Sequence, residues 1–173
     1  GHSLTDNPLG DHIVSIANSL GGSSAARYNQ QIVIGSPIRF RTDRNANWAG
    51  YSRGKNRDGT GMNVINELRS PTTLGGDRYD TLLIAENHNS LQMLQWEDTV
   101  RNLRHFHERF IAGNASGRSL FYETWIDIND KSNPAAWIAH ERAQSKAWQC
   151  VATRVNTALA AEGRSDRITP MPA

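Results

Sequence analysis

The sequence predicts an α/β fold in which helices pack on a mainly parallel sheet. The clearest strand is residues 81–85, where four apolar residues and a threonine stand between polar segments, a pattern typical of buried parallel strands. Segments with helical spacing of apolar residues alternate with short apolar runs along the chain. Polar residues follow the runs at 32–34 and 81–85. This alternation indicates an α/β layer architecture.

Four segments are expected to be helices. The first, residues 9–20, has one apolar stripe, begins after Asn7-Pro8 and ends at Gly21-Gly22, which are common start and stop signals. The others are residues 62–69, 96–111 and 134–162, the last of which is expected in two pieces. Its inward side chains would be Trp148, Val151, Ala152, Val155 and Leu159.

Three segments are expected to be strands. Residues 32–34 form a short apolar run that Gly35-Ser36-Pro37 closes, and residues 81–85 and 119–128 complete the set. If 119–128 is extended throughout, Glu123, Trp125 and Asp127 share one face. Residues 39–61 are rich in Gly, Asn and Arg, and a long polar loop of this kind often shapes a site.

Composition excludes several classes of protein. The chain has 173 residues with a net charge of +2 and a mean hydropathy of −0.60, and it contains no apolar run long enough to span a membrane. The single cysteine, Cys150, closes no intrachain disulfide and builds no zinc site alone. No P-loop or dinucleotide fingerprint occurs. We therefore expect no metal, no cofactor and no membrane span.

Residues suited to acyl transfer are expected at the carboxyl edge of the sheet, where function gathers in α/β folds. Ser3 stands just before the first helix, whose N-terminal dipole favours a developing oxyanion. Gly35 and Asn87 each follow a predicted strand and offer a backbone N–H and a side-chain amide. One nucleophile with three donors, counting the N–H of Ser3, outlines an acyl-transfer site.

Three short motifs resemble conserved blocks of the SGNH (GDSL) hydrolases. Gly1-His2-Ser3-Leu4 resembles the Gly-Asp-Ser-Leu block, with histidine in place of aspartate. Ile34-Gly35-Ser36 is similar to the second block, whose glycine donates to the oxyanion. Ala85-Glu86-Asn87-His88 resembles the Gly-x-Asn-Asp block and keeps its asparagine. The three motifs occur in the family's order and at about its spacing, so the resemblance covers most of the chain.

The resemblance implies a three-layer α/β/α sandwich with flavodoxin-like layering and a serine esterase or deacylase that works through an acyl-enzyme. It assigns Ser3 as nucleophile and Gly35 and Asn87 as oxyanion donors. The substrate would be a small-molecule or glycan ester, with acetyl or short acyl groups on carbohydrate as the first expectation. The resemblance slightly favours a secreted or periplasmic location.

The general base is the main departure from the family. The family's Asp-x-x-His block has no counterpart near the end of this chain, and no strand precedes Gly1. We therefore expect residues 1–173 to be a single domain that is incomplete at both ends, with an Asp/His pair in a companion fragment. The alternative is that His88, or less favourably His2, has become the base.

Three residues are expected to bind substrate: His88 at the strand end, Trp48 in the polar loop, and Trp125. Each has a plainer alternative, since His88 is equally suited to an orienting role, Trp48 to loop packing and Trp125 to the core. Arginines and a lysine between residues 39 and 57 make the loop cationic, which is consistent with a solvated loop or with an anionic substrate. His105 and His107 flank Phe106 and are expected at the surface or between helices.

Two rival functions stay open at this point. A domain of the same fold that binds glycans or acyl ligands without turnover would explain the altered first and third blocks. Nucleic-acid binding through the cationic loop is the weaker rival, because a net charge of +2 lacks the concentrated basic face of such proteins. We expect no nucleic-acid partner.

Overall fold

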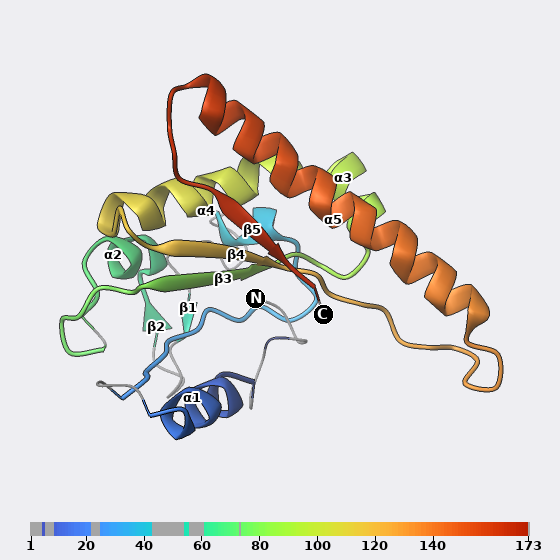
Figure 1. Ribbon diagram of the computed structural model, residues 1–173, viewed down its shortest axis with the longest axis horizontal. Helices are drawn as coiled ribbons and strands as arrows, with labels where there is room; N and C mark the ends of the chain where they lie inside the picture. Colours follow the sequence, from blue (N-terminus) through green and yellow to red (C-terminus); the bar gives the residue numbers. More distant parts are fainter. Residues whose placement is uncertain are drawn as a thin grey trace.

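Three parallel strands form the main sheet of the computed structural model, in the order β3 (Thr81–Ala85), β4 (Arg118–Tyr122) and β5 (Ile168–Met171) (Figure 1). The structure describes residues 5, 9–21, 25–42, 54–55, 61–72 and 74–172. The strands pair in register, with Leu83 opposite Leu120 and Leu120 opposite Thr169. A second, two-stranded antiparallel pair joins β1 (Gly54–Lys55) to β2 (Gly61–Met62). The protein is thus a mixed α/β fold with an all-parallel main sheet.

Helices both precede the parallel strands and connect them. They are α1 (Leu9–Ser19), the 3-10 helix η2 (Ile38–Arg41), α2 (Val64–Arg69), α3 (Ser90–Trp96), α4 (Thr99–Gly113) and α5 (Ala135–Ala161). Of these, α3 and α4 connect β3 to β4, and α5 connects β4 to β5. Parallel neighbours require crossovers of this kind, because a tight turn reverses the chain direction.

The core lies between one face of the sheet and the helices α4 and α5, which contact each other as well as the sheet. Phe121 of β4 meets Trp148 of α5 edge to face, with 4.9 Å between ring centroids, a preferred aromatic geometry. The predicted inward residues of α5, from Trp148 to Leu159, are all buried. The helical spacing of apolar residues therefore identified the buried face of α5 correctly.

The opposite face of the sheet is less covered. Leu83, Leu120 and Tyr122 point to this face and are only half-buried. Helix α1 has no buried residue, and Figure 1 shows it apart from the other helices. Ile16 in this helix is 61% exposed. The apolar stripe predicted for residues 9–20 is present, but in this structure it faces no core.

Two strand predictions were wrong, at least in part. Residues 32–34 form no strand, because the backbone turns at Gly35 (φ +70°) and Ser36 N–H bonds to the nearby carbonyl of Val33 (3.2 Å) rather than to another strand. The strand predicted for 119–128 ends at Tyr122. Beyond it the chain bends toward α5, where Ile126 N–H donates to Glu141.

Two helix predictions also need correction. Residues 96–111 are not one helix, because Trp96 ends α3 and Asp98 takes a left-handed conformation (φ 49°) before α4 begins at Thr99. Residues 134–162 form a single helix instead of two pieces. Residues 135–161 contain no glycine or proline, so nothing local interrupts that helix.

Candidate functional site

The residues predicted at the second and third motifs lie side by side at the carboxyl end of β3. Asn87 follows this strand directly, and its Nδ2 donates a hydrogen bond to the carbonyl of Gly35 (3.1 Å). The segment that carries Gly35 runs alongside the chain entering β3, since Asn29 Nδ2 donates to Tyr79 Oη (2.9 Å). The structure therefore brings Gly35 and Asn87 together although 52 positions separate them.

Hydrogen bonds fix the orientation of the Asn87 amide. Its Oδ1 accepts from Asn89 N–H (3.1 Å), and one Nδ2 hydrogen goes to Gly35. An amide nitrogen has two hydrogens, so one remains for a ligand. Gly35 is exposed, and among the described residues its N–H meets no acceptor. Two hydrogen-bond donors thus stand at one edge of the sheet.

A buried carboxylate lies directly beneath this pair. Glu86 is fully buried, and its Oε1 accepts from both Ile38 N–H (2.8 Å) and Asn87 N–H (2.7 Å). Its Oε2 accepts from Thr99 Oγ1 (3.0 Å). Burial raises the pKa of Glu86, while Arg41 and the three donors act to lower it. Glu86 falls at the variable position of the third motif, so the motif did not single it out, although a glutamate directly after an apolar strand is itself unusual.

Arg41 is the buried counter-charge of Glu86. Its Nη2 donates to the carbonyl of Ala85 (2.7 Å), at the last residue of β3. Burial lowers the pKa of Arg41 to about 10, while the charge of Glu86 acts to raise it. The described part of the cationic loop is therefore not simply solvated, because Arg41 is buried and Arg39 pairs with Glu97.

Trp125 and His88 stand at the same edge as Asn87. The preceding Thr124 donates through Oγ1 to the carbonyl of Glu86 (3.3 Å), which places Trp125 beside the Asn87 segment. Trp125 is 36% exposed and meets Tyr122 edge to face. His88 is exposed. Ser3, His2 and Trp48 lie outside the described residues, so the structure does not place the predicted nucleophile.

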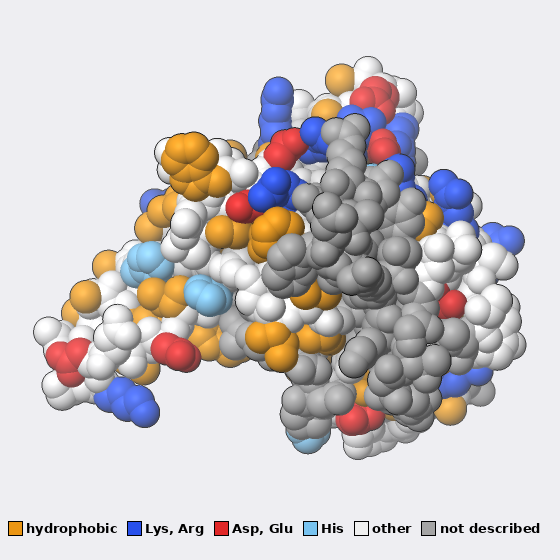
Figure 2. Space-filling model, turned by 180° about the vertical axis from the view of Figure 1, so that it is seen from behind, with side chains coloured by type: hydrophobic (Ala, Val, Ile, Leu, Met, Phe, Trp, Pro, Cys, Tyr) orange, Lys and Arg blue, Asp and Glu red, His pale blue; other side chains and the backbone are white. Residues whose placement is uncertain are grey.

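Helix α5 forms one side of this edge. Gln144 Nε2 donates to the carbonyl of His88 (2.9 Å), and its Oε1 accepts from both the N–H and the hydroxyl of Ser90. Farther out, Trp137 Nε1 donates to the carbonyl of Ile126 (2.8 Å). Figure 2 shows hydrophobic and histidine side chains gathered where the molecule projects at this end. Helix α5 thus borders the edge through hydrogen bonds to the segments that follow β3 and β4.

A second polar cluster contains a serine, a histidine and an aspartate. His107 Nδ1 lies 2.8 Å from Ser119 Oγ, and His107 Nε2 lies 2.7 Å from Asp166 Oδ2. Burial acts to raise the pKa of Asp166, but Arg164 and His107 outweigh it and lower this pKa to about 2. The ionised carboxylate only accepts, so Nε2 carries the proton and Ser119 donates to Nδ1.

The serine and the histidine of this cluster are closed to solvent. His107 and Ser119 are fully buried, so no substrate reaches the hydroxyl. Ser119 lies near the start of β4 and Asp166 just before β5, at the amino edge of the sheet and opposite Asn87. Burial lowers the pKa of His107, although Asp166 acts to raise it. The expectation that His107 is a surface or interhelix residue was wrong, because it joins α4 to the sheet.

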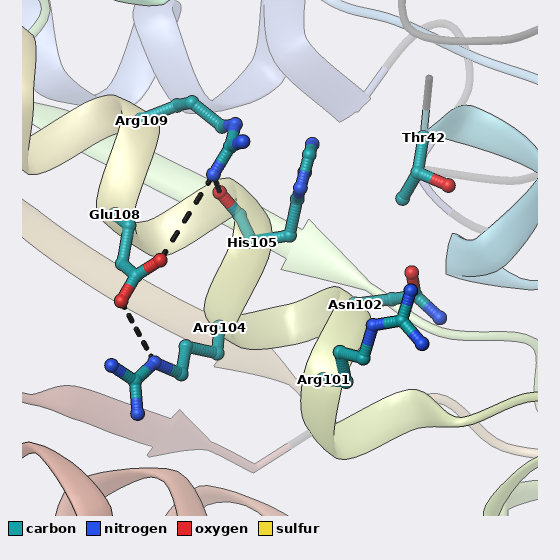
Figure 3. Close-up of a pocket in the computed structure, with 7 residues that line it drawn as sticks. All are labelled: Thr42, Arg101, Asn102, Arg104, His105, Glu108 and Arg109. Carbon is teal, nitrogen blue, oxygen red and sulfur yellow. Dashed lines mark hydrogen bonds and ion pairs between the residues drawn. The ribbon is translucent and has the colours of Figure 1, made fainter. Parts of the chain in front are cut away.

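A basic pocket of about 250 Å³ lies along α4 (Figure 3). Its lining residues are Thr42, Arg101, Asn102, Arg104, His105, Glu108 and Arg109. Arg104 and Arg109 both pair with Glu108, at 2.7 and 4.0 Å. Arg101 pairs with Asp98 (3.1 Å). Because acids already pair with these arginines, the pocket carries little uncompensated positive charge.

The described residues contain neither a candidate metal site nor a membrane-spanning helix. In the described ranges, no cluster of three or more His, Cys, Asp or Glu side chains is arranged to hold a metal ion. Across the same ranges, no helix is both long and apolar enough to cross a membrane. Comparisons with protein-family models, curated proteins and solved structures find no match. The resemblance to SGNH hydrolases therefore depends on the quoted motifs alone.

Proposed function

We propose that this chain carries the active site of an SGNH-type serine ester hydrolase. The single observation that carries the proposal is the contact between Asn87 Nδ2 and the Gly35 carbonyl (3.1 Å). It joins two of the three motif segments at the carboxyl edge of a parallel sheet, where α/β proteins bind ligands. Gly35 N–H and the second Asn87 amide hydrogen would then hold an oxyanion.

In the proposed reaction, Ser3 Oγ attacks the ester carbonyl and its proton passes to a general base. The oxyanion of the tetrahedral intermediate accepts from Ser3 N–H, Gly35 N–H and Asn87 Nδ2. The intermediate expels the alcohol, which takes the proton, and leaves an acyl-serine. Water then adds to this ester with the same base, so that the acid is released and Ser3 is regenerated.

Two sources of the base are compatible with this proposal. The first is an Asp/His pair on a companion fragment, as the resemblance implies. The second is His88, which is exposed and adjoins Asn87. Its carbonyl is held by Gln144, so its backbone position is fixed beside the proposed oxyanion donors. Trp125 at the same edge would contact the acyl or sugar part of the ester.

We also propose that the fold in solution is the three-layer α/β/α sandwich. Two incompletely covered apolar surfaces support this. One is the sheet face with Leu83, Leu120 and Tyr122, and the other is the stripe on α1 that includes Ile16. Packing one against the other would remove both from water, which is favourable by about 25 cal/mol per Å² of apolar surface.

The test is intact-mass measurement after incubation with a fluorophosphonate, using the wild-type chain and Ser3→Ala. A single adduct in the wild type that is lost in Ser3→Ala supports an activated nucleophile. Asn87→Ala should slow adduct formation by about 10²- to 10³-fold, the usual effect of losing one oxyanion donor. No adduct on folded wild-type protein would refute a base within this chain and would favour the companion-fragment source or ligand binding without turnover.

Asn114 offers a matched control for Asn87. Its Nδ2 donates to the carbonyl of Tyr79 (2.8 Å) and its Oδ1 accepts from Ser116 N–H (3.1 Å), which is the hydrogen-bond pattern of Asn87. Asn114→Ala therefore removes equivalent bonds at the opposite edge of the sheet. It should lower stability and leave the labelling rate of folded protein unchanged.

Ligand binding without turnover is the second candidate function. The observation that favours it is that His107, whose ring is hydrogen-bonded to both a serine and a carboxylate, is buried at the opposite edge of the sheet. Under this alternative, a sugar or acyl ligand binds beside Trp125 and quenches tryptophan fluorescence, while no fluorophosphonate adduct forms.

A further inference from the structure

We propose that Glu86 is the positioning residue of the candidate site. One of its two carboxylate oxygens, Oε1, holds the backbone of the Gly35 segment and the backbone of the Asn87 segment at a fixed separation. The geometry of the described residues supports the placement of the two segments by Glu86. The effect of that placement on catalysis rests on the proposed function.

The two backbone contacts of Oε1 come from different parts of the chain. Ile38 N–H, three residues after Gly35, donates at 2.8 Å, and Asn87 N–H donates at 2.7 Å. Both distances are short for N–H···O bonds, as is usual when the acceptor is charged. Glu86 Oε1 therefore joins the two segments on their buried side. The bond between Asn87 Nδ2 and the Gly35 carbonyl joins them on their exposed side.

The other contacts of Glu86 hold this carboxylate in place. Oε2 accepts from Thr99 Oγ1 (3.0 Å) at the start of α4. The carbonyl of Glu86 accepts from Thr124 Oγ1 (3.3 Å) beyond β4. Each hydrogen-bonding group that faces the carboxylate is a donor, and Arg41 supplies a buried positive charge. These donors and this charge favour the ionised form and oppose burial, which raises the pKa of Glu86.

This arrangement explains how two donors on different segments stay aligned. Catalysis by preorganised donors requires positions fixed to within about half an ångström. Gly35 is exposed, so its own packing does not fix it. Glu86 is buried and reaches no substrate, so its effect on an oxyanion would be indirect, through the placement of Gly35 N–H and the Asn87 amide.

Two substitutions distinguish the effect of the length of the Glu86 side chain from the effect of its charge. Glu86→Gln keeps Oε1 in place but removes the charge. Glu86→Asp keeps the charge but shortens the side chain by one methylene, so its oxygen no longer spans both N–H groups. Glu67→Asp is the matched control, because Glu67 is also buried and accepts from Tyr79 Oη and Thr72 N–H, away from the site.

The measurements are the ¹H–¹⁵N spectrum of the full chain and its rate of fluorophosphonate labelling. We expect Glu86→Asp to shift the backbone resonance of Gly35 and the side-chain resonance of Asn87, and to slow labelling by about 100-fold, as for a misplaced oxyanion donor. Glu86→Gln should retain both resonances and label within about tenfold of wild type. Glu67→Asp should change neither, even if its Tm falls.

The outcomes separate the inference from the proposed function. If Glu86→Asp leaves the Gly35 and Asn87 resonances unmoved, Glu86 does not position the site, whatever the labelling rates are. If Glu86→Gln is as damaging as Glu86→Asp, charge rather than reach is what matters, and the inference is wrong. If wild type is not labelled at all, the hydrolase proposal with a base in this chain fails, while the resonances still decide the role of Glu86.

Discussion

Replacing Asp166 by asparagine tests the buried cluster at the amino edge of the sheet. Asp166 Oδ2 accepts from His107 Nε2 (2.7 Å) and from Arg164 Nη2 (2.6 Å), and its side chain is 15% exposed. Asparagine keeps the shape and one acceptor oxygen but removes the charge. Asp166→Asn therefore measures the contribution of the charge to the free energy of unfolding, together with the hydrogen bond from Arg164 Nε to Oδ1 (3.0 Å) that the amide loses.

The magnitude follows from the pKa of Asp166, which is lowered to about 2 from the ordinary 3.8. A shift of that size corresponds to roughly 2.5 kcal/mol of stability at neutral pH. Solvent screening on the exposed side reduces this to about 1–2 kcal/mol. Because the folded pKa is the lower one, the unfolded chain binds more protons between pH 3.8 and 2. The contribution is therefore complete above pH 3.8 and is lost as the pH falls toward 2.

The assay is urea unfolding of wild type and Asp166→Asn at pH values from 7 to 3. We expect Asp166→Asn to lower the free energy of unfolding by about 1–2 kcal/mol at pH 7, with the difference shrinking below pH 4. Asp77→Asn is the control, because Asp77 pairs with Arg27 on the surface and exposed pairs contribute at most about 1 kcal/mol. An effect of Asp166→Asn below about 0.5 kcal/mol at pH 7, or a difference that stays constant to pH 3, would refute the reasoning.

Four further predictions follow from single residues. Burial lowers the pKa of His107, so wild-type stability should decline as the pH falls below about 6.5, and His107→Gln should lose that slope in the same urea experiment. His88→Ala should abolish fluorophosphonate labelling if His88 is the base, whereas unchanged labelling would exclude His88 from that role. Ile16→Asp should lower stability by about 1–2 kcal/mol if α1 covers the sheet, and an unchanged Tm would mean that the helix stays exposed. A Cβ at Gly113 would lie 2.1 Å from the carbonyl oxygen of Leu68, so Gly113→Ala should cost about 1–3 kcal/mol in thermal unfolding, and a neutral result would contradict the close packing of α4 on α2.

The elements that sequence patterns predicted best are those with a strong local signal. Residues 81–85 are a strand with the predicted bounds, and the apolar face of α5 is buried as expected. The break between α3 and α4 was missed because the left-handed Asp98 is neither glycine nor proline. Residues 32–34 were predicted as a strand from their composition, but pairing depends on a partner strand that local sequence does not specify.

The candidate site was predictable where it depends on motifs and unpredictable where it depends on tertiary contacts. Gly35 and Asn87 were singled out from short motifs, and the structure brings them into contact, although Gly35 lies in a turn and not at the end of the strand expected at 32–34. The contacts of Glu86 with Ile38 and Thr99 span 48 and 13 positions, so no local pattern reveals them. The placement of Ser3 and its role stay predictions.

Helix α5 has a consequence for how the protein opens. Its buried residues begin at Gln144, so the first nine residues, from Ala135 to Ala143, contribute none to the core. Amide protons from Gln144 onward should exchange only on global unfolding, whereas those of the first turns should exchange through local fraying. Gln144 is also the residue that holds His88 and Ser90. Amide exchange along α5 should therefore change from fast to slow at Gln144, the residue that attaches this helix to the candidate site.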